Sequence, residues 1–198
     1  MSRRFAKYSG TEATQMADEL ASFIKLLQDR GAQSYLEIGA RCGDTFDAVM
    51  RALPPGSMGV AIDLPDSGWG ESESAKKLSK VCFDLNRDSY DVRMLLGSSR
   101  DEQIIETVET LIKRGMFDAI LVDGDHSYDG VVADHFNYFE MGKLVAYHDI
   151  AWQPDGNTPI EVPRLWQELK ADAAAVKHFI HEIVAPGSAM GIGVIIRE

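Results

Sequence analysis

Apolar and polar positions along the chain follow two periods that predict alternating helices and strands. Between Thr11 and Arg30, apolar side chains recur at spacings of three and four, which predicts an amphipathic helix that stops at Gly31. Residues Ser34–Ile38 form a short, largely apolar run that leads into glycines, as a buried strand does. From there to the end of the chain, helix and strand patterns alternate.

The alternation continues through five more helices and six more strands. The helices are expected at Asp44–Leu53, Ser74–Asn86, Asp101–Lys113, Gly130–Phe139 and Val162–Ala174. The strands are expected at Met58–Ile62, Val92–Leu96, Phe117–Val122, Lys143–Tyr147, Phe179–Val184 and Ile192–Ile196. Parallel strands need long crossovers, and the first five strands have helices between them. The predicted fold class is therefore α/β: a seven-stranded, mostly parallel sheet with helices on both faces and an antiparallel last strand.

The length of the chain and the absence of linker-like tracts in its sequence predict one domain. The 198 residues suffice for a single hydrophobic core, and the sequence contains no internal repeat or linker-like tract. We expect one domain over residues 1–198. Within it, residues 1–31 would form an N-terminal helix that packs on the core of residues 32–198 or closes over its ligand site as a lid.

Charge and hydropathy restrict the class of partner. The chain has 31 acidic and 20 basic residues, a net charge of -11, and no cluster of Lys and Arg, so we do not expect nucleic acid as a partner. No apolar stretch reaches the length of a membrane span, and no apolar run follows the basic residues at the N-terminus. A cytoplasmic enzyme without membrane partners is expected. A homo-oligomer remains compatible with the sequence.

The turn after the first core strand is the first candidate binding element. Glu37 ends the strand, and Gly39 and Gly43 follow in the pattern E-x-G-x-x-x-G, which differs from the dinucleotide fingerprint G-x-G-x-x-G. An acidic residue at the strand end suits a ligand that carries a cationic amino group and a sulfonium rather than phosphates. The alternative is that such glycines serve only the chain reversal, because they are common after strands in α/β proteins.

Asp63 ends the second core strand and extends this candidate site. A carboxylate at that position can accept hydrogen bonds from the two hydroxyls of a ribose, as in proteins that bind dinucleotides or S-adenosylmethionine. The alternative is an Asp that only starts a turn, since Pro65 follows closely.

These segments, in this order, resemble the first three motifs of class I S-adenosylmethionine-dependent methyltransferases. The resemblance rests on Leu36–Gly39 with Gly43, on Asp63, and on Gly97–Asp101, and it runs in order from Tyr35 to Glu198. It implies a Rossmann-like sheet and S-adenosylmethionine as cofactor. The third segment resembles the one that contacts adenine in catechol-type O-methyltransferases. The cofactor-binding residues implied are Glu37, Gly39, Gly43, Asp63, Ser98, Ser99 and Asp123.

A second group of ionisable residues follows the fourth and fifth core strands. Asp123–Tyr128 has the sequence DGDHSY, and His148–Asp149 ends the next strand. Neighbouring parallel strands bring such ends together, and crowded carboxylates raise one another's pKa unless a cation such as Mg²⁺ lies between them. The alternative is structural: the first group caps the following helix, and His148–Asp149 stabilises a turn.

The same residues narrow the resemblance to small-molecule and sugar O-methyltransferases, including the macrolide-sugar and cephalosporin-hydroxylase-like groups. It implies a metal ion, Mg²⁺ or Mn²⁺, on Asp123, His148 and Asp149, with Asp123 and His126 catalytic and His126 as the base. His148 stands where many relatives have an acid, which would favour Mn²⁺. The expected function is metal-assisted O-methylation of a small hydroxylated acceptor, such as a sugar or natural product. Trp69 could stack on adenine, gate the acceptor pocket, or merely pack in its loop.

Two other functions remain open. One is an NAD-dependent oxidoreductase on a similar sheet, against which the absent third glycine and the lack of a Tyr-x-x-x-Lys pair argue. The other is a non-enzymatic protein of the same fold that binds a nucleoside cofactor, because fold alone does not guarantee activity.

Overall fold

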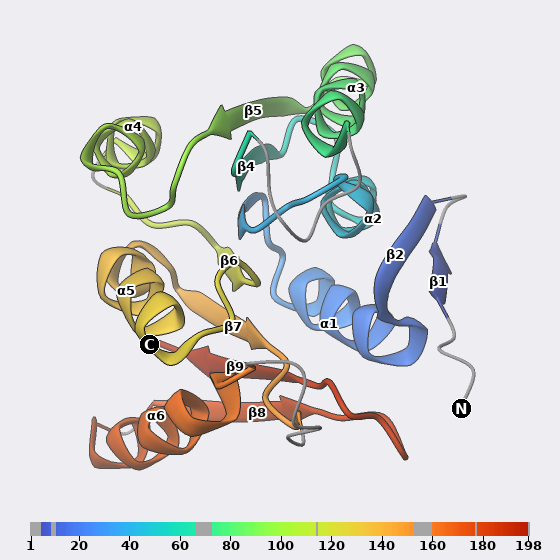
Figure 1. Cartoon of the computed structure of the whole chain (residues 1–198). Coiled ribbons are helices and arrows are strands. Elements are labelled where there is room, and N and C mark those ends of the chain that lie inside the picture. The colour runs from blue at the N-terminus through green and yellow to red at the C-terminus, as the bar shows by residue number, and fades with distance from the viewer. Residues whose placement is uncertain are drawn as a thin grey trace.

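The centre of the molecule is a seven-stranded sheet with the order β5-β4-β3-β6-β7-β9-β8 (Figure 1). The computed structural model describes residues 5–8, 11–65, 73–113, 115–152, 160–176 and 178–197. The first five strands of this sheet run parallel, and β9 runs antiparallel to both β7 and β8. This confirms the predicted fold class. The strands are β3 (Ser34–Ile38), β4 (Met58–Asp63), β5 (Asp91–Leu96), β6 (Ala119–Val122), β7 (Leu144–His148), β8 (Phe179–Ile183) and β9 (Ile192–Ile196).

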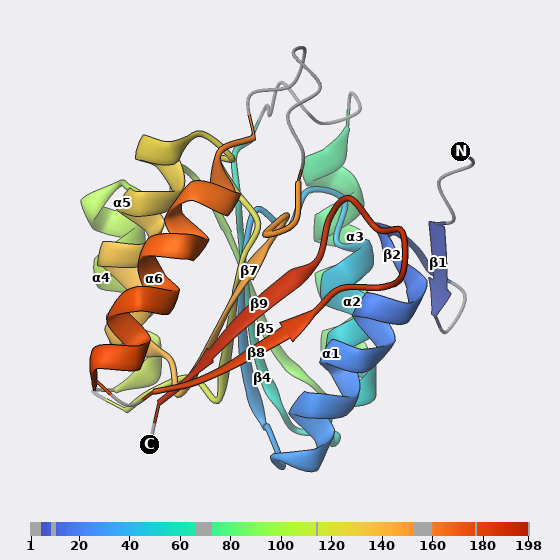
Figure 2. The same ribbon diagram turned by 90° about the horizontal axis from the view of Figure 1, so that it is seen from below.

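Helices cover both faces of the sheet (Figures 1 and 2). One face carries α1 (Ala17–Asp29), α2 (Asp44–Ala52) and α3 (Ser74–Arg87). The other face carries α4 (Glu102–Ile112), α5 (Tyr128–Tyr138) with the short helix η1 (Phe139–Met141), and α6 (Val162–Val176). Each layer of helices buries its own apolar cluster against the sheet. Burial of apolar area on both faces is the main stabilising contribution to such a fold.

The N-terminal segment differs from its prediction. Residues Thr11–Met16 form β2, which pairs antiparallel with β1 (Phe5–Tyr8), and the helix begins only at Ala17. The apolar positions that predicted a helix start at Met16, whereas residues 11–15 are Thr-Glu-Ala-Thr-Gln and carry no apolar stripe. The two β-branched threonines favour extended backbone there. That residues 1–31 close over the site stays a prediction.

A buried acid connects α1 to the antiparallel end of the sheet. Glu19 is completely buried, and its carboxylate accepts the backbone N–H groups of Ala185 at 2.9 Å and Gly191 at 3.2 Å. Both residues belong to the connection between β8 and β9. These hydrogen bonds hold that connection against the first turn of α1.

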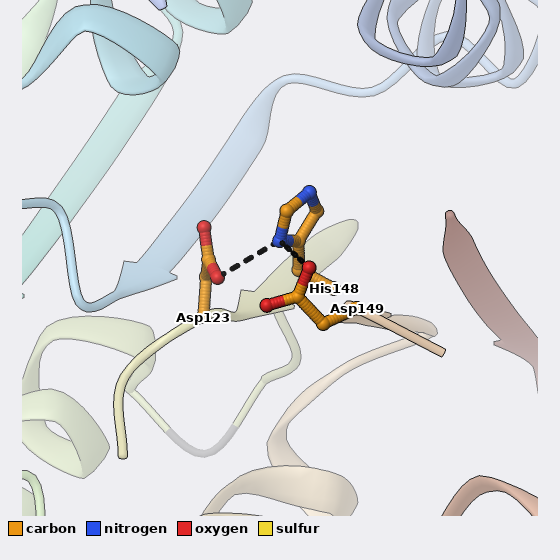
Figure 3. A group of neighbouring side chains, drawn as sticks. All are labelled: Asp123, His148 and Asp149. Carbon is orange, nitrogen blue, oxygen red and sulfur yellow. Dashed lines mark ion pairs between the residues drawn. The ribbon is translucent and has the colours of Figure 1, made fainter. Parts of the chain in front are cut away.

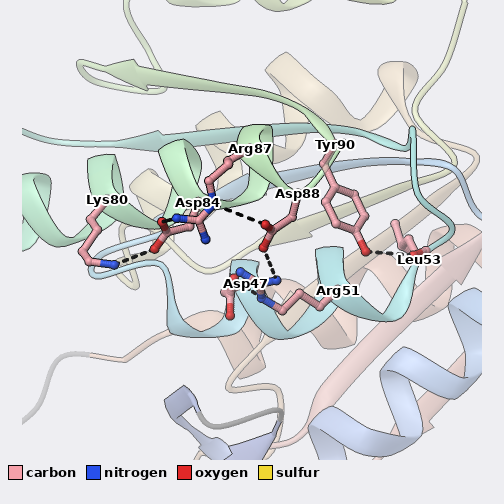
Figure 4. Close-up of polar contacts among 8 residues, drawn as sticks. All are labelled: Asp47, Arg51, Leu53, Lys80, Asp84, Arg87, Asp88 and Tyr90. Carbon is pink, nitrogen blue, oxygen red and sulfur yellow. Dashed lines mark hydrogen bonds and ion pairs between the residues drawn. The ribbon is translucent and has the colours of Figure 1, made fainter.

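Polar contacts also join α2 and α3 at their C-terminal ends (Figure 4). Arg51 donates to Asp47 at 2.8 Å and to Asp88 at 3.0 Å, and the Tyr90 hydroxyl donates to the Leu53 carbonyl oxygen at 3.4 Å. Tyr90 immediately precedes β5, so this group lies at the edge of the sheet where the parallel strands begin. The candidate site lies at the opposite edge.

None of the helices in the described ranges is long and apolar enough to cross a membrane.

Candidate active site at the carboxyl edge of the sheet

The turn after β3 packs directly against the turn after β6. Gly39 has φ +87°, and a Cβ there would lie 2.1 Å from the carbonyl oxygen of Asp123. The N–H of Asp123 donates to the Ile38 carbonyl oxygen at 2.9 Å, so the two turns are also bonded to each other. Gly39 is required for this close approach because any side chain would collide with the backbone. Gly43, with φ +86°, lies against Leu78 of α3, which a Cβ would approach to 2.9 Å, and its contact with the cofactor stays a prediction.

Glu37 lies beneath this turn in a fully enclosed position. It is 2% exposed, and the Tyr35 hydroxyl donates to its Oε2 at 2.6 Å. Burial raises the pKa of Glu37 to about 8, although the hydrogen bond from Tyr35 acts in the opposite direction. Glu37 is therefore mainly a neutral acid at pH 7 while no ligand is bound. A cationic ligand would have to draw its proton away.

Asp63 ends β4 beside the same turn. Its Oδ1 accepts the N–H of Leu64 at 2.7 Å, and its buried Oδ2 accepts no hydrogen bond from any described residue. Burial raises the pKa of Asp63, and backbone hydrogen bonds from Leu64 and Arg41 counteract that rise. A buried acceptor without a partner is rare in proteins and fits a ligand hydroxyl. Arg41, which reaches Asp63 with left-handed backbone at φ 49°, was not singled out from the sequence.

The turn that contains Ser98 and Ser99 follows β5 and is bonded to Asp63. The Gly97 N–H donates to the Asp63 carbonyl oxygen at 2.9 Å. The Ser99 hydroxyl donates to Oδ1 of Asp134, in α5, at 2.5 Å. Sequence reasoning missed Asp134. A signal was present, because Val131, Asp134 and Tyr138 follow one another at spacings of three and four and so share the buried face of a helix.

Asp123, His148 and Asp149 come together at the ends of β6 and β7 (Figure 3). His148 Nδ1 lies 3.2 Å from Asp123 Oδ1 and 3.3 Å from Asp149 Oδ1. One ligand atom from each residue lies within 4.8 Å of the others. Consecutive residues in a strand point to opposite faces, but Asp149 has left-handed backbone at φ 63° and turns back toward the cluster.

The electrostatics of this cluster correct one step of the sequence argument. Burial would raise the pKa of Asp123, but His148 and His126 outweigh it and hold that pKa far below its usual range. Burial would lower the pKa of His148, but Asp123 and Asp149 outweigh it and raise that pKa well above 6.5. His126 and His148 therefore supply the positive charge that the sequence analysis assigned to a metal ion. The proximity of Asp123 and Asp149 does not by itself require a metal ion between them.

The donor atoms still fit a divalent ion. Within the described part of the chain, neither ring nitrogen of His148 makes a hydrogen bond, and neither does Asp149 Oδ1, although all three atoms are buried. His148 Nδ1 and Asp149 Oδ1 face each other as an ion pair at 3.3 Å, whereas Nε2 makes no such contact in these residues. Buried polar atoms without hydrogen bonds call for an explanation, and ligation is one. A donor set of two carboxylates and one imidazole suits Mn²⁺ better than Mg²⁺, which prefers oxygen ligands.

His126 lies on the same cluster from the turn after β6. Its Nε2 lies 3.2 Å from Asp123 Oδ1 and 3.9 Å from Asp149 Oδ2. Burial acts to lower the pKa of His126, but the two carboxylates outweigh it and raise that pKa. An imidazole paired with a carboxylate in this way can accept a proton from a substrate hydroxyl.

The structural alternative for DGDHSY accounts for only part of the motif. Ser127 caps α5 by accepting the Gly130 N–H at 3.2 Å, and Asp125 Oδ1 accepts the N–H and the hydroxyl of Ser127 at 3.0 and 2.7 Å. Asp125 and Ser127 are therefore structural. Asp123 and His126 do not take part in this cap.

The structure thus places the predicted residues along one edge of the sheet. It brings Asp123, His126, His148 and Asp149 into direct proximity, with the Glu37, Asp63 and Ser98–Ser99 positions at the ends of the neighbouring strands. Trp69 lies outside the described residues, and its role stays a prediction.

Solved methyltransferases have the same fold. The O-methyltransferase TomG from Streptomyces achromogenes, involved in tomaymycin synthesis and solved with SAM, is 16% identical with a TM-score of 0.62 over 92% of this chain and 81% of that one. An O-methyltransferase from Bacillus cereus, solved with SAH, is 16% identical with a TM-score of 0.60 over 90% of this chain and 80% of that one. The chain therefore has the fold of class I methyltransferases, and these identities are too low to transfer an acceptor.

Sequence comparison adds little about activity. No family model matches the chain. A curated relative, "Uncharacterized protein R132" from Acanthamoeba polyphaga mimivirus, is 29% identical over 127 residues, which is 61% of this chain. The chain spans about half of that relative, 54% of its length.

Proposed function

We propose that this protein is an S-adenosylmethionine-dependent methyltransferase that methylates a hydroxyl group of a small acceptor. The observation that carries the proposal is the His126–Asp123 pair with His148 and Asp149, at the strand ends next to the predicted cofactor turn of a methyltransferase fold. A cofactor-binding scaffold without activity would have no need for a carboxylate–imidazole cluster at that edge.

The residues divide the chemistry between binding and proton transfer. S-adenosylmethionine supplies an activated methyl group, so the protein must align the acceptor oxygen and remove its proton. Oδ2 of Asp63 would accept a ribose hydroxyl, and the 97–100 turn would face the base. His126 would take the acceptor proton on Nδ1, because its Nε2 faces Asp123, which would orient the ring and stabilise its charge. A divalent ion on Asp123, His148 and Asp149 would lower the pKa of the acceptor hydroxyl.

The net charge supports a small acceptor. At -11 the chain repels polyanions, so nucleic acid is a poor candidate for the acceptor. We propose a sugar or another hydroxylated natural product, methylated by residues 1–198 acting as one domain. No observation favours a nicotinamide cofactor.

Isothermal calorimetry with S-adenosylhomocysteine tests the proposal. We expect micromolar binding, and we expect Asp63→Ala to weaken it about tenfold or more because a hydrogen bond to a charged group is lost. Asp118→Ala is the matched control, since Asp118, like Asp63, accepts a backbone N–H, that of Gln33 at 2.9 Å, but at the opposite edge of the sheet. No binding at high micromolar ligand, or tighter binding of NADH in a fluorescence titration, would refute the proposal.

Metal removal is expected to abolish turnover. Treatment with a chelator followed by desalting should stop methyl transfer, and Mn²⁺ should restore it better than Mg²⁺ because His148 contributes a nitrogen. The assay is release of S-adenosylhomocysteine with an acceptor found by screening hydroxylated compounds. Full turnover in metal-free protein would contradict the metal role, because His126 and His148 alone would then balance the charge of Asp123 and Asp149. The methyltransferase proposal itself would stand.

A further inference from the structure

Two buried side chains of α5 hold one residue of the turn after β5. Asp134 is 1% exposed, and its Oδ1 accepts the Ser99 hydroxyl at 2.5 Å. Tyr138, one helical turn further along, is fully buried and donates its hydroxyl to the Ser99 carbonyl oxygen at 2.7 Å. The hydroxyl and the backbone of Ser99 are thus held by the same face of one helix.

An aspartate at position 134 lowers the stability of the folded protein. Its second oxygen, Oδ2, is buried and makes no hydrogen bond within the described residues. A Cβ on Gly124 would lie 3.3 Å from that oxygen, so the backbone of the 123–124 turn shields it from water. Burial raises the pKa of Asp134 to about 6, and the carboxyl is still ionised above pH 7. Burying a partly unpaired carboxylate lowers stability, so a functional gain is a reasonable cause for its presence.

The ionised carboxylate sets the direction of the hydrogen bond with Ser99. A carboxylate can only accept, so the Ser99 hydroxyl must donate its single proton to Asp134. The Ser99 Oγ then keeps only lone pairs for any further partner. Ser99 is only half-buried, so a ligand at this turn would meet an acceptor rather than a hydroxyl that can rotate to donate.

The position of the 97–100 turn indicates which part of a bound nucleoside it would contact. The Gly97 N–H donates to the backbone oxygen of Asp63, so the turn begins next to the residue whose side chain is assigned to the ribose. A base attached to that ribose would lie against residues 97–100. Adenine presents an amino group at position 6, a donor, whereas a 6-oxo purine such as hypoxanthine presents an acceptor there.

We propose that Asp134 makes Ser99 an obligate hydrogen-bond acceptor and thereby selects adenine over 6-oxo purines in the cofactor. The inference rests on the proposed function, because it requires a nucleoside at Asp63. Asp134 is a specificity-determining residue that acts through Ser99, and Tyr138 fixes the backbone that presents Ser99. A 6-oxo ligand would place two acceptors against each other, which costs affinity.

The test compares two ligands in calorimetry at pH 8: S-adenosylhomocysteine and S-inosylhomocysteine, its 6-oxo analogue. We expect wild-type protein to bind the adenosyl compound at least about tenfold more tightly, the usual cost of one mismatched hydrogen bond. In Asp134→Ala the Ser99 hydroxyl is free to donate, so the preference should fall to less than about threefold. Ser99→Ala should also abolish the preference, and it removes a single small hydroxyl without emptying a buried site.

The ratio of the two dissociation constants separates specificity from a merely structural role. If Asp134 only stabilised the fold, its loss would weaken both ligands equally and leave the ratio unchanged, as we expect for Asp118→Ala. An unchanged ratio in Ser99→Ala and in folded Asp134→Ala would overturn the inference while leaving the proposed function in place. If neither ligand bound wild-type protein, the proposed function would fail and the inference with it.

Discussion

Replacing His126 by alanine is expected to lower kcat by about a hundredfold or more. His126 is the imidazole paired with Asp123 at 3.2 Å, and a positioned base contributes roughly a hundredfold to ten-thousandfold to proton transfer. The affinity for S-adenosylhomocysteine should stay within about threefold of wild type, because the base acts on the acceptor. The measurement is the release of S-adenosylhomocysteine at saturating cofactor and acceptor.

His181→Ala is the matched control. His181 is an exposed histidine on β8, away from the carboxylate cluster, and its loss should leave kcat unchanged. If His126→Ala turned over at the wild-type rate, His126 would not be the base, and proton removal would have to be reassigned within the same cluster.

Glu37→Gln is expected to stabilise the protein at alkaline pH and to weaken cofactor binding. Burial raises the pKa of Glu37 from 4.5 to about 8. Between these two values the unfolded chain has released the proton of Glu37 and the folded protein still holds it. Folding therefore takes up a proton, and the contribution of Glu37 to stability falls as the pH rises from about 4.5 to about 8.

A glutamine at position 37 stays neutral, so the variant does not lose stability in this way as the pH rises. At pH 8.5 we expect Glu37→Gln to raise the free energy of unfolding by up to about 4 kcal/mol, and at pH 4.5 we expect little difference from wild type. The glutamine amide oxygen can still accept the hydrogen bond from Tyr35. Urea denaturation at the two pH values measures the difference.

The matched control is Glu109→Gln, on an exposed position of α4, which should unfold like wild type at both pH values. Equal stability of Glu37→Gln and wild type at pH 8.5 would mean that folding does not raise the pKa of Glu37. A gain in stability together with weaker binding would show that the sequence keeps a destabilising acid because the cofactor uses its charge.

The core of the fold was predictable because the spacing of its apolar residues follows the helix and strand periods closely. The helices and strands from Ser34 onward occur where the apolar spacing predicts them, with ends shifted by a few residues. Residues 11–16 were assigned to the helix because the apolar stripe that starts at Met16 was extended backward into a segment without one. The antiparallel last strand was predicted, but the placement of β9 between β7 and β8 was not, because strand order depends on packing that no local pattern encodes.

The part of the candidate site that lies directly after the strand ends was predictable from the sequence. Asp123 and His148–Asp149 could be brought together from sequence because parallel neighbours share an edge. Their charge states could not, because these depend on burial and on which imidazole lies against which carboxylate. The helical spacing around Asp134 indicates that it is buried, but its partner could not be identified, because Ser99 is 35 residues away in the sequence.

A crystal structure with S-adenosylhomocysteine tests the central claim most directly, because it shows where the sulfur lies. The account predicts ribose hydroxyls on Asp63, adenine against Ser98 and Ser99, and the sulfur facing the cluster of Asp123, His126, His148 and Asp149. The separation between the sulfur and the His126 ring should leave room for one acceptor oxygen and the methyl group. A nucleoside bound away from Asp63, or a sulfur that faces away from the cluster, would contradict the account.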